Sequence, residues 1–278
     1  MKQKSYDGRP TLYIVPTPIG NMEDITFRAI NILKSVEVIF AEDTRETRSL
    51  LKHFNIQKKL ISSHLYNEDG NCKQEIEYLE QGKDIAVVSD RGTPIISDPG
   101  YILVKEAIKN NFNVVCLPGA TAFVPGLVTS GLDNNHFTFY GFLNSKESKR
   151  KKELEDLKEH KYTLIFYEAP HRILKTLKNI QSIFGNRQAV IAREISKKYE
   201  EIIRGNIDYL IKECENIKGE IVLIVEGNKE EKDYNSLSIL DHISLYLKEG
   251  KDSKEAIKLV AKDRNIPKSK VYKEFHLK

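Results

Sequence analysis

Four segments combine proline, glycine and small polar residues in a way that suits the enclosure of a ligand. They are Pro-Thr-Pro-Ile-Gly-Asn at 16–21, Glu-Asp-Thr-Arg at 42–45, the segment 90–100 that begins Asp-Arg-Gly-Thr-Pro, and Pro-Gly-Ala-Thr-Ala at 118–122. Proline fixes the backbone angle φ and glycine frees it, so these segments form loops of defined shape. Each follows a short apolar run. In open parallel sheets ligands bind beyond the carboxyl ends of the strands, so the four loops together predict one binding site.

The same loops lack the usual signatures of nucleotide sites. No G-x-G-x-x-G follows the first apolar run, and no G-x-x-x-x-G-K-[ST] occurs in the chain. Neither a dinucleotide pyrophosphate nor a nucleoside triphosphate therefore has its usual glycine cradle. Asp90, with Gly92 and Thr93 behind it, instead suits a ligand that offers hydroxyl groups and a positive centre.

The elements that position these loops follow an alternating pattern. Short β-branched or aromatic runs at 12–15, 36–41, 60–63, 85–89 and 114–117 are separated by segments in which apolar residues recur at helical spacing. This rhythm predicts an α/β lobe with a largely parallel sheet. A polar, strongly basic segment at 144–152 marks a boundary, and the pattern restarts with runs at 163–167, 189–192, 201–204 and 220–225. We therefore expect an N-terminal lobe at 1–142 and a second α/β or α+β lobe at 143–227.

A helical tail at 237–278 completes the expected organisation, with breaks at Gly250 and Pro267. It holds 10 Lys and Arg against 6 Asp and Glu, while the rest of the chain has 34 of each. All of the formal net charge of +4 thus lies in the tail. A basic terminal module is one way in which enzymes gain affinity for nucleic acid.

Composition excludes several classes of protein. The 278 residues are 30% charged and 40% hydrophobic, with a mean hydropathy of -0.45, as in soluble globular proteins. No apolar run approaches the length of a membrane span, and Pro16 interrupts the N-terminal one too early for a signal peptide. Three widely spaced cysteines form no C-x-x-C pair. We expect a cytoplasmic protein that binds no metal and no membrane.

Long motifs in the chain resemble a known family. Leu-Tyr-Ile-Val-Pro-Thr-Pro-Ile-Gly-Asn at 12–21, Ala-Glu-Asp-Thr-Arg at 41–45, the segment 88–100, Leu-Pro-Gly-Ala-Thr-Ala at 117–122 and Thr-Leu-Ile-Phe-Tyr-Glu at 163–168 are similar to those of the ribosomal RNA small subunit methyltransferase I family. That family lies within the tetrapyrrole-methylase superfamily. The similarity extends over about residues 11–227, through segments 192–197 and 218–226.

The resemblance implies a two-lobed, usually homodimeric enzyme of the tetrapyrrole-methylase-like (class III methyltransferase) fold. Such an enzyme carries S-adenosyl-L-methionine between its lobes and methylates the ribose 2'-hydroxyl of a cytidine in 16S ribosomal RNA, as free RNA or in the small ribosomal subunit. By motif, the residues expected at the cofactor are Pro18, Asp90, Gly92, Thr93, Thr121, Ala122 and Tyr167.

One position departs from the family pattern. The family usually reads Ser-Asp-Ala-Gly-Thr-Pro, whereas this chain has Arg91 in place of the alanine. A guanidinium beside the cofactor's sulfonium would be unfavourable if both were desolvated. We therefore expect Arg91 to point outward, toward RNA phosphate.

Transfer of a methyl group to a ribose hydroxyl also needs a group that accepts the hydroxyl proton. The candidates for this base in recognisable motifs are Asp43, His64, Glu168 and Glu194, and Lys197 or Arg45 would lower the pKa of the hydroxyl or hold a phosphate. Structural alternatives remain open. Asp43 is also a candidate for a helix cap that forms an ion pair with Arg45, and Glu168 for a cap of the next helix. Glu194 and Lys197 alternatively form an ordinary ion pair. His64 is alternatively a structural or surface histidine. We predict catalytic functions for Asp43, Glu168, Glu194 and Lys197, and we expect Arg45, His64 and Arg91 at the substrate.

The tail pattern from Ser253 to Phe275 resembles a helix-turn-helix, with a turn near Pro267 and a Lys-rich second helix. Lys268 and Lys270 are its expected RNA contacts. The alternative is a helical appendage that packs on the body or on a dimer partner. Two other functions stay open for the whole chain: a precorrin-type tetrapyrrole methyltransferase of the same fold, and a DNA-binding regulator that reads DNA with the tail.

Overall fold

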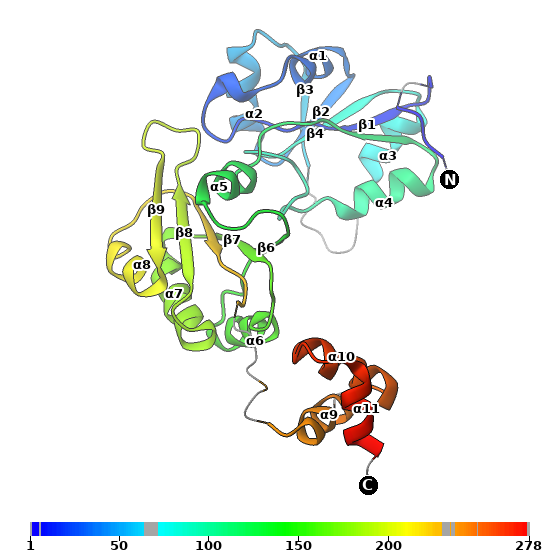
Figure 1. Cartoon of the computed structure of the whole chain (residues 1–278). Helices are drawn as coiled ribbons and strands as arrows, with labels where there is room; N and C mark the ends of the chain where they lie inside the picture. Colours follow the sequence, from blue (N-terminus) through cyan, green and yellow to red (C-terminus); the bar gives the residue numbers. More distant parts are fainter. Residues whose placement is uncertain are drawn as a thin grey trace. The chain divides into compact units, whose positions relative to one another are not determined.

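The first five apolar runs form one parallel sheet in the computed structural model of the chain (Figure 1). Its strands are β1 (Thr11–Ile14), β2 (Val38–Ala41), β3 (Lys59–Ser62), β4 (Ile85–Val88) and β5 (Asn113–Cys116). Their order is β3-β2-β4-β1-β5, and every neighbouring pair is parallel. The predicted parallel sheet is therefore confirmed, with each strand starting within two residues of the expected position.

Helices cover both faces of this sheet because alternate strand residues point to opposite faces. A 3-10 turn η1 (Met22–Asp24) precedes α1 (Phe27–Ser35), and the remaining helices of the lobe are α2 (Thr44–His53), α3 (Lys73–Glu80) and α4 (Tyr101–Lys109). Leu33 of α1 and Leu51 of α2 pack with Tyr13 on one face. Leu79 of α3 and Leu103 of α4 pack with Leu12 on the other. The helix after β4 thus lies on the face opposite to the helices after β1 and β2, which are the neighbours of β4. This arrangement makes the carboxyl end of β4 the point where a ligand crevice is expected.

A second five-stranded sheet follows, with the order β6-β7-β10-β8-β9. Its strands are β6 (Phe137–Phe142), β7 (Thr163–Glu168), β8 (Gln188–Arg193), β9 (Glu201–Asn206) and β10 (Ile221–Val225). Only the β6–β7 pair is parallel. Helices α6 (Glu147–Leu157), α7 (Pro170–Phe184) and α8 (Ile207–Glu213) belong to this lobe, and their apolar residues, including Leu154, Leu177 and Leu210, form its largest core.

The expected boundary at residue 142 needs one correction. It assigns β6 to the first lobe, but β6 pairs with β7 in the second sheet. The change of sheet therefore comes before Phe137. The basic segment that suggested the boundary forms the start of α6, where Arg150 is buried and donates hydrogen bonds to Asn179 and to the carbonyls of Asn144 and Ser145.

Helix α5 (Phe123–Ser130) joins the two lobes. Leu127 of α5 shares an apolar cluster with Ile19 from the loop after β1 and with Ile165, Val190 and Val222 of the second sheet. Both sheets belong to one compact unit, Met1–Asn228. Burial of this cluster fixes the edge of the first sheet against a face of the second.

The tail, Lys229–Lys278, is a separate compact unit. Helices α9 (Ile239–Lys248), α10 (Ser253–Asp263) and α11 (Lys268–His276) pack around Ile243, Ile257, Val260 and Val271. Asp252 caps α10 by accepting a hydrogen bond from the backbone N–H of Glu255.

The structure describes residues 2–5, 7–63, 72–229, 234, 237–248 and 250–276. Within these residues no helix is both long enough and apolar enough to cross a membrane.

Candidate functional site

A cleft of about 670 Å³ lies at the carboxyl edge of the first sheet, where the second lobe faces it. The loops after β1, β2, β4 and β5, with the first turn of α2, contribute Ile19, Glu42, Asp43, Glu46, Ser89, Asp90, Arg91, Gly92, Thr93, Ile96, Ser97, Asp98, Thr121 and Ala122. The second lobe contributes Phe142, Tyr167, Glu168, Ala169, Pro170, Ile195, Glu220, Ile221 and Val222. The four segments singled out in the sequence therefore meet in one place. The volume lies in the usual range for a small-molecule site.

Backbone contacts hold three of these loops together. Thr17 and Gly92 exchange backbone hydrogen bonds of 2.9 and 3.0 Å, and the Thr17 hydroxyl donates to the carbonyl of Ser89. Gly92 has φ of +78°, and a Cβ there would lie 3.3 Å from the side chain of Ile19. The Thr93 hydroxyl donates to the carbonyl of Ala120 over 3.0 Å. The site loops therefore keep a fixed shape.

Asp90 stands at the crevice that the sheet topology predicts. One carboxylate oxygen accepts a hydrogen bond of 3.0 Å from the backbone N–H of Asp43. Partial burial raises the pKa of Asp90, and the nearby carboxylates of Glu42, Asp43 and Glu46 act in the same direction. No described residue donates to its second oxygen, which therefore remains available to a ligand hydroxyl.

Asp43 and Arg45 adopt the structural alternative considered for them. The Asp43 carboxylate caps α2 by accepting from the backbone N–H of Arg45 over 2.8 Å, and it pairs with the Arg45 guanidinium at 2.6 Å. These contacts lower the pKa of Asp43 to about 2, the hydrogen bond from the Arg45 side chain being the largest cause. A carboxylate of such low basicity is a weak proton acceptor.

Glu168 also occupies a structural position. Its side chain is fully buried at the end of β7, where it accepts hydrogen bonds from the Ala169 backbone N–H at 2.9 Å and the Thr176 hydroxyl at 2.5 Å. It pairs with Arg172 at 3.2 Å, and Arg172 donates to the carbonyl of Leu143. Glu168 thus joins β7, α7 and the end of β6 beside the cleft.

Tyr167, the preceding residue, presents its ring to the cleft. Its centroid lies 5.0 Å from that of Phe139 and 5.6 Å from that of Phe142. Burial raises the pKa of its phenol, so Tyr167 stays neutral at physiological pH. It provides the second lobe's aromatic wall.

A cluster of four charged residues links the lobes at the rim. Glu220 pairs with Arg91 of the loop after β4 and with Lys197 at 3.0 Å, and Lys197 also pairs with Glu194 at 2.9 Å. The Lys197 ammonium and the Glu220 backbone N–H lower the pKa of Glu194. The Lys197 stem lies against Gly20, where any Cβ would overlap it. Arg91, expected to point outward, is half exposed and reaches across to the second lobe.

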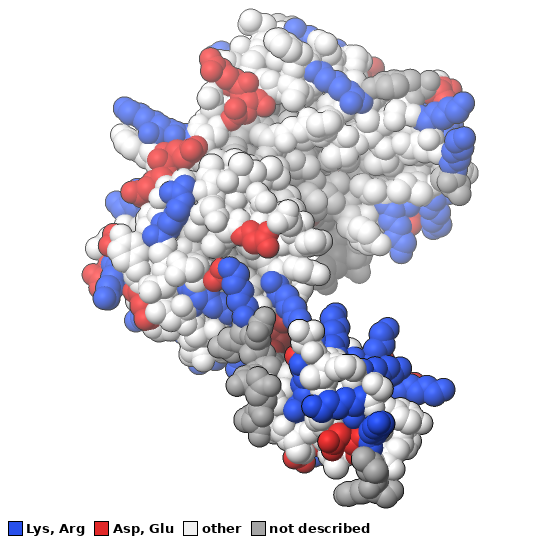
Figure 2. Space-filling model, viewed as in Figure 1, with Lys and Arg blue, Asp and Glu red and all other residues white. Residues whose placement is uncertain are grey.

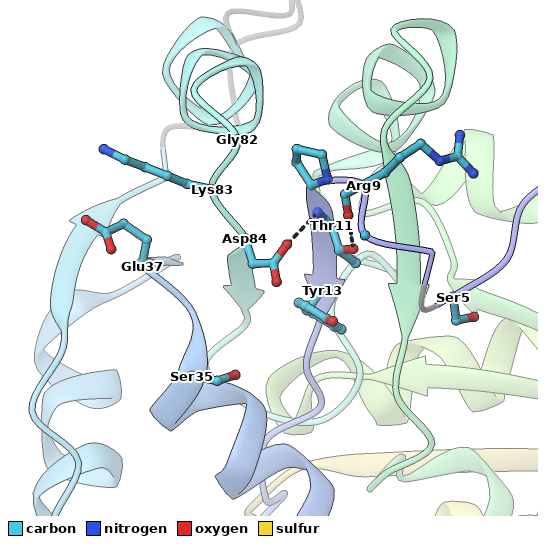
Figure 3. Close-up of a pocket in the computed structure, with 11 residues that line it drawn as sticks. Ser5, Arg9, Thr11, Tyr13, Ser35, Glu37, Gly82, Lys83 and Asp84 are labelled. Atoms are coloured by element: carbon cyan, nitrogen blue, oxygen red, sulfur yellow. Dashed lines mark hydrogen bonds between the residues drawn. The ribbon is translucent and has the colours of Figure 1, made fainter.

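A second hollow, of about 580 Å³, lies at the amino edge of the first sheet (Figure 3). Here Asp84 accepts a hydrogen bond of 2.8 Å from the backbone N–H of Thr11, and the Thr11 hydroxyl donates to the carbonyl of Arg9. These contacts provide hydrogen-bond partners for the backbone N–H and the hydroxyl of Thr11 at the start of β1. The hollow lies at the opposite strand ends from the four site loops, so it is separate from the cleft.

Comparison with known proteins identifies the fold family. Residues 11–211 match the sequence profile of the tetrapyrrole (corrin/porphyrin) methylases. The chain belongs to this family. The tetrapyrrole-methylase fold expected from the motifs is thereby confirmed. Solved structures agree: a cobalt precorrin-4 methyltransferase, a cobalamin biosynthetic enzyme, superposes with a TM-score of 0.58 and 15% identity over 81% of this chain and 98% of its own. A uroporphyrin-III-C-methyltransferase from Thermus thermophilus superposes with a TM-score of 0.55 and 17% identity, over 78% of this chain and 94% of its own.

Closer relatives carry the name ribosomal RNA small subunit methyltransferase I, and the chain belongs to that group of tetrapyrrole methylases. The protein of Bacillus subtilis (strain 168) is 47% identical over 100% of this chain and 99% of its own length. The protein of Halalkalibacterium halodurans is 48% identical over 99% of this chain and 98% of its own length. The protein of Buchnera aphidicola is 44% identical over 94% of each chain. The family resemblance proposed from the motifs is thus confirmed, and it extends through the tail.

The tetrapyrrole-methylase cleft gathers most of the residues selected from the sequence. Asp43, Asp90, Arg91, Gly92, Thr93, Thr121, Ala122, Tyr167 and Glu168 all line it. Pro18 precedes the lining residue Ile19, and Glu194 and Lys197 contact Glu220 at the rim. Arg45 pairs with Asp43 and does not line the cleft. His64 lies outside the described residues, and Lys268 and Lys270 are exposed on α11 of the separate tail unit.

Sequence reasoning missed several lining residues, of which Glu42, Glu46, Asp98 and Glu220 carry charge. Glu42 and Asp98 stand inside quoted motifs, and their acidic side chains were the available signal. Glu220 also stands in a quoted segment, 218–226, but its approach to Arg91 depends on how the two lobes pack. Within the described residues, no group of three or more His, Cys, Asp or Glu is placed to hold a metal ion.

Proposed function

We propose that the chain is an S-adenosyl-L-methionine-dependent methyltransferase that modifies a cytidine ribose 2'-hydroxyl in 16S ribosomal RNA. The observation that carries this proposal is identity of 43–48% over nearly the whole length with relatives named ribosomal RNA small subunit methyltransferase I. The expected residues gather in one cleft, which supports it. A substrate of this kind places the reaction in the cytoplasm.

The residues of the cleft fit the cofactor. Asp90 offers a carboxylate oxygen to ribose hydroxyls, Gly92 allows close approach of the backbone, and Tyr167 supplies an apolar wall. With Pro18, Thr93, Thr121 and Ala122 they would hold the cofactor, as the motifs predict. When bound, the cofactor supplies a methyl group on a positively charged sulfur. The carboxylates of Glu42, Asp43, Glu46 and Asp90 favour a cationic ligand here.

We assign positioning functions to the residues selected as catalytic. Glu168 holds the amino end of α7 against β6. Asp43 fixes α2 and donates its backbone N–H to Asp90. Lys197 lies against Gly20 of the loop after β1, and Glu194 and Lys197 both contact Glu220, which pairs with Arg91 of the loop after β4. In each case the charged atoms are engaged by protein partners, so these residues orient the site, and orientation supplies much of the rate of a displacement reaction.

We further propose that the tail binds RNA. Lys254, Lys258 and Lys262 of α10 and Lys268, Lys270 and Lys273 of α11 are exposed, and Figure 2 shows basic side chains gathered on the visible face of this unit. Lysines at such spacing suit phosphate contacts. Arg91 at the cleft rim and the exposed Arg45 guanidinium are the proposed contacts in the first lobe.

We also propose a homodimer, as the resemblance implies. The described residues expose large apolar side chains, with Phe27 at 88%, Tyr101 at 69% and Val128 at 65%. Burial of any of these side chains at an interface between subunits would be favourable. Light scattering coupled to size exclusion tests this, and a monomer at micromolar concentration would contradict it.

The decisive test of the function is a map of ribose methylation in ribosomal RNA from cells with and without the protein. Loss of a single cytidine 2'-O-methyl group, restored in vitro by the purified protein with labelled S-adenosyl-L-methionine, is the expected result. An unchanged map would contradict the proposal. Methylation of a tetrapyrrole instead of RNA would favour the alternative reaction of this fold.

A further inference from the structure

Asp98 lies in the loop between β4 and α4, and the backbone of that loop is unusual. Ile95 and Ser97 have positive φ angles of 73° and 63°, and Gly100 has 133°. Left-handed conformations cost free energy for residues with a Cβ and concentrate at functional sites. Asp98 therefore occupies a position that the loop maintains at some cost.

The Asp98 side chain is half buried where two hollows adjoin. It lines the main cleft together with Asp90, Thr93 and Tyr167. It also lines a small adjoining pocket with Ser63 and Ser89. This places Asp98 among the expected cofactor residues.

The Asp98 carboxylate differs in its partners from the acids first considered as bases, and unlike the exposed Glu46 it is partly buried. Asp43 pairs with Arg45, Glu168 with Arg172, and Glu194 with Lys197. Within the described residues, no hydrogen bond or ion pair engages the carboxylate of Asp98. It is therefore able to accept a proton without first breaking a contact.

The surroundings of Asp98 also make it more basic than an exposed aspartate. Burial raises the pKa of Asp98 to about 6, and the negative charges of Glu42 and Asp90 contribute in the same direction. The titratable groups that face it are Glu42 at the end of β2, Asp90 at the end of β4 and the neutral phenol of Tyr167 on β7. A base is most effective when its pKa lies near the working pH.

We propose that Asp98 is the general base that removes the proton from the methyl-accepting ribose hydroxyl, an inference that rests on the function proposed above. The hydroxyl oxygen forms a bond to the methyl carbon as the carbon–sulfur bond breaks. The electron pair of that bond stays on sulfur, which becomes a neutral thioether. The hydroxyl proton passes to the Asp98 carboxylate and from there to water.

The test is Asp98→Asn in the full-length protein, assayed in single turnover with 16S ribosomal RNA from cells that lack the protein. The amide keeps the size of the side chain but cannot take the proton. We expect the rate to fall by about 10²–10⁴-fold, with S-adenosyl-L-methionine and RNA affinities within about threefold of the wild type. Unchanged turnover would overturn the inference. Loss of cofactor binding in a folded variant would also overturn it, because Asp98 would then be a binding residue.

The pH profile separates a base from a merely structural residue. The wild-type rate should fall as the pH drops through about 6, because a protonated Asp98 cannot accept the proton. The residual rate of Asp98→Asn should lack this dependence. Glu42→Gln removes a neighbouring negative charge, so it should lower the pKa of Asp98 and move the acidic limb to lower pH. An acidic limb retained in Asp98→Asn would assign the titration to another group and overturn the inference.

A matched control distinguishes the site from a general loss of charge. Asp156→Asn removes the same charge from an exposed position on α6 and should keep the wild-type rate and pH profile. Wild-type protein that methylates no ribosomal RNA would contradict the proposed function itself. Active wild type with an equally active Asp98→Asn would contradict only the assignment of the base.

Discussion

Asp90 combines two contacts at the end of a single strand. One oxygen orders the loop after β2 through the Asp43 backbone N–H, which leaves the other for the cofactor. Asp90→Ala should weaken S-adenosyl-L-methionine binding by about tenfold or more, because a hydrogen bond to a charged group is worth roughly 1.5–3 kcal/mol. Isothermal calorimetry measures this change. Unaltered affinity in a well-folded variant would show that the cofactor binds elsewhere.

Glu168 illustrates a different kind of residue, one whose loss should affect the fold first. Its buried carboxylate faces Arg172, whose side chain is itself mostly buried. Glu168→Gln leaves that guanidinium without its counter-charge, and breaking a buried pair in this way costs about 3 kcal/mol of the free energy of unfolding. Urea denaturation should show this loss. Glu215→Gln, which changes an exposed side chain after α8, should leave the unfolding midpoint unchanged.

At the scale of elements, the loop after β4 joins the two lobes through Arg91. Its ion pair with Glu220 is half exposed on both sides, and exposed pairs contribute at most about 1 kcal/mol. Arg91→Ala, which restores the usual family residue, should therefore change the free energy of unfolding by less than about 1 kcal/mol. If Arg91 contacts RNA phosphate, the slope of log K against log salt should flatten by roughly 0.7–0.9. Salt titrations with wild type and variant decide whether it does.

Elements whose character is local could be predicted from the sequence. Strands β1 and β4 are short apolar runs followed by proline and glycine, so both their existence and the grouping of their loops followed from local pattern. The assignment of β6 to a sheet did not follow from local pattern. Residues 137–142 precede the basic segment that suggested the lobe boundary, and only their pairing with β7 assigns them to the second sheet. Strand pairing depends on contacts between residues far apart in the chain, which a single sequence does not show.

Some residues of the site could likewise be predicted from local motifs, whereas the contacts of others could not. Asp90 and Tyr167 were found because each stands at the end of a strand in a long motif, and both line the cleft. The partners of Glu168 and Glu220 could not be found from the sequence. Whether a carboxylate is free or engaged depends on residues such as Thr176 and Arg91 that reach it only after the elements pack. This difference separates Asp98 from Asp43, Glu168 and Glu194.

For the whole molecule, the open question is what the tail contributes. Lys268→Gln together with Lys270→Gln leaves the tail core around Val271 untouched, because both lysines are exposed on α11. RNA affinity should fall, and the slope of log K against log salt should flatten by roughly 1.4–1.8 if both contact phosphate. Cofactor affinity should not change, since the cleft is built by residues 19–222 alone.

The control must remove the same charge from the body, away from the cleft. Lys34→Gln with Lys52→Gln does so at the last turns of α1 and α2, which run away from the carboxyl edge of the sheet. This control should retain the wild-type slope. If the tail serves only as a packed appendage, both double variants will show the same RNA affinity and salt dependence as the wild type, and the proposed RNA contact of α11 would then be wrong.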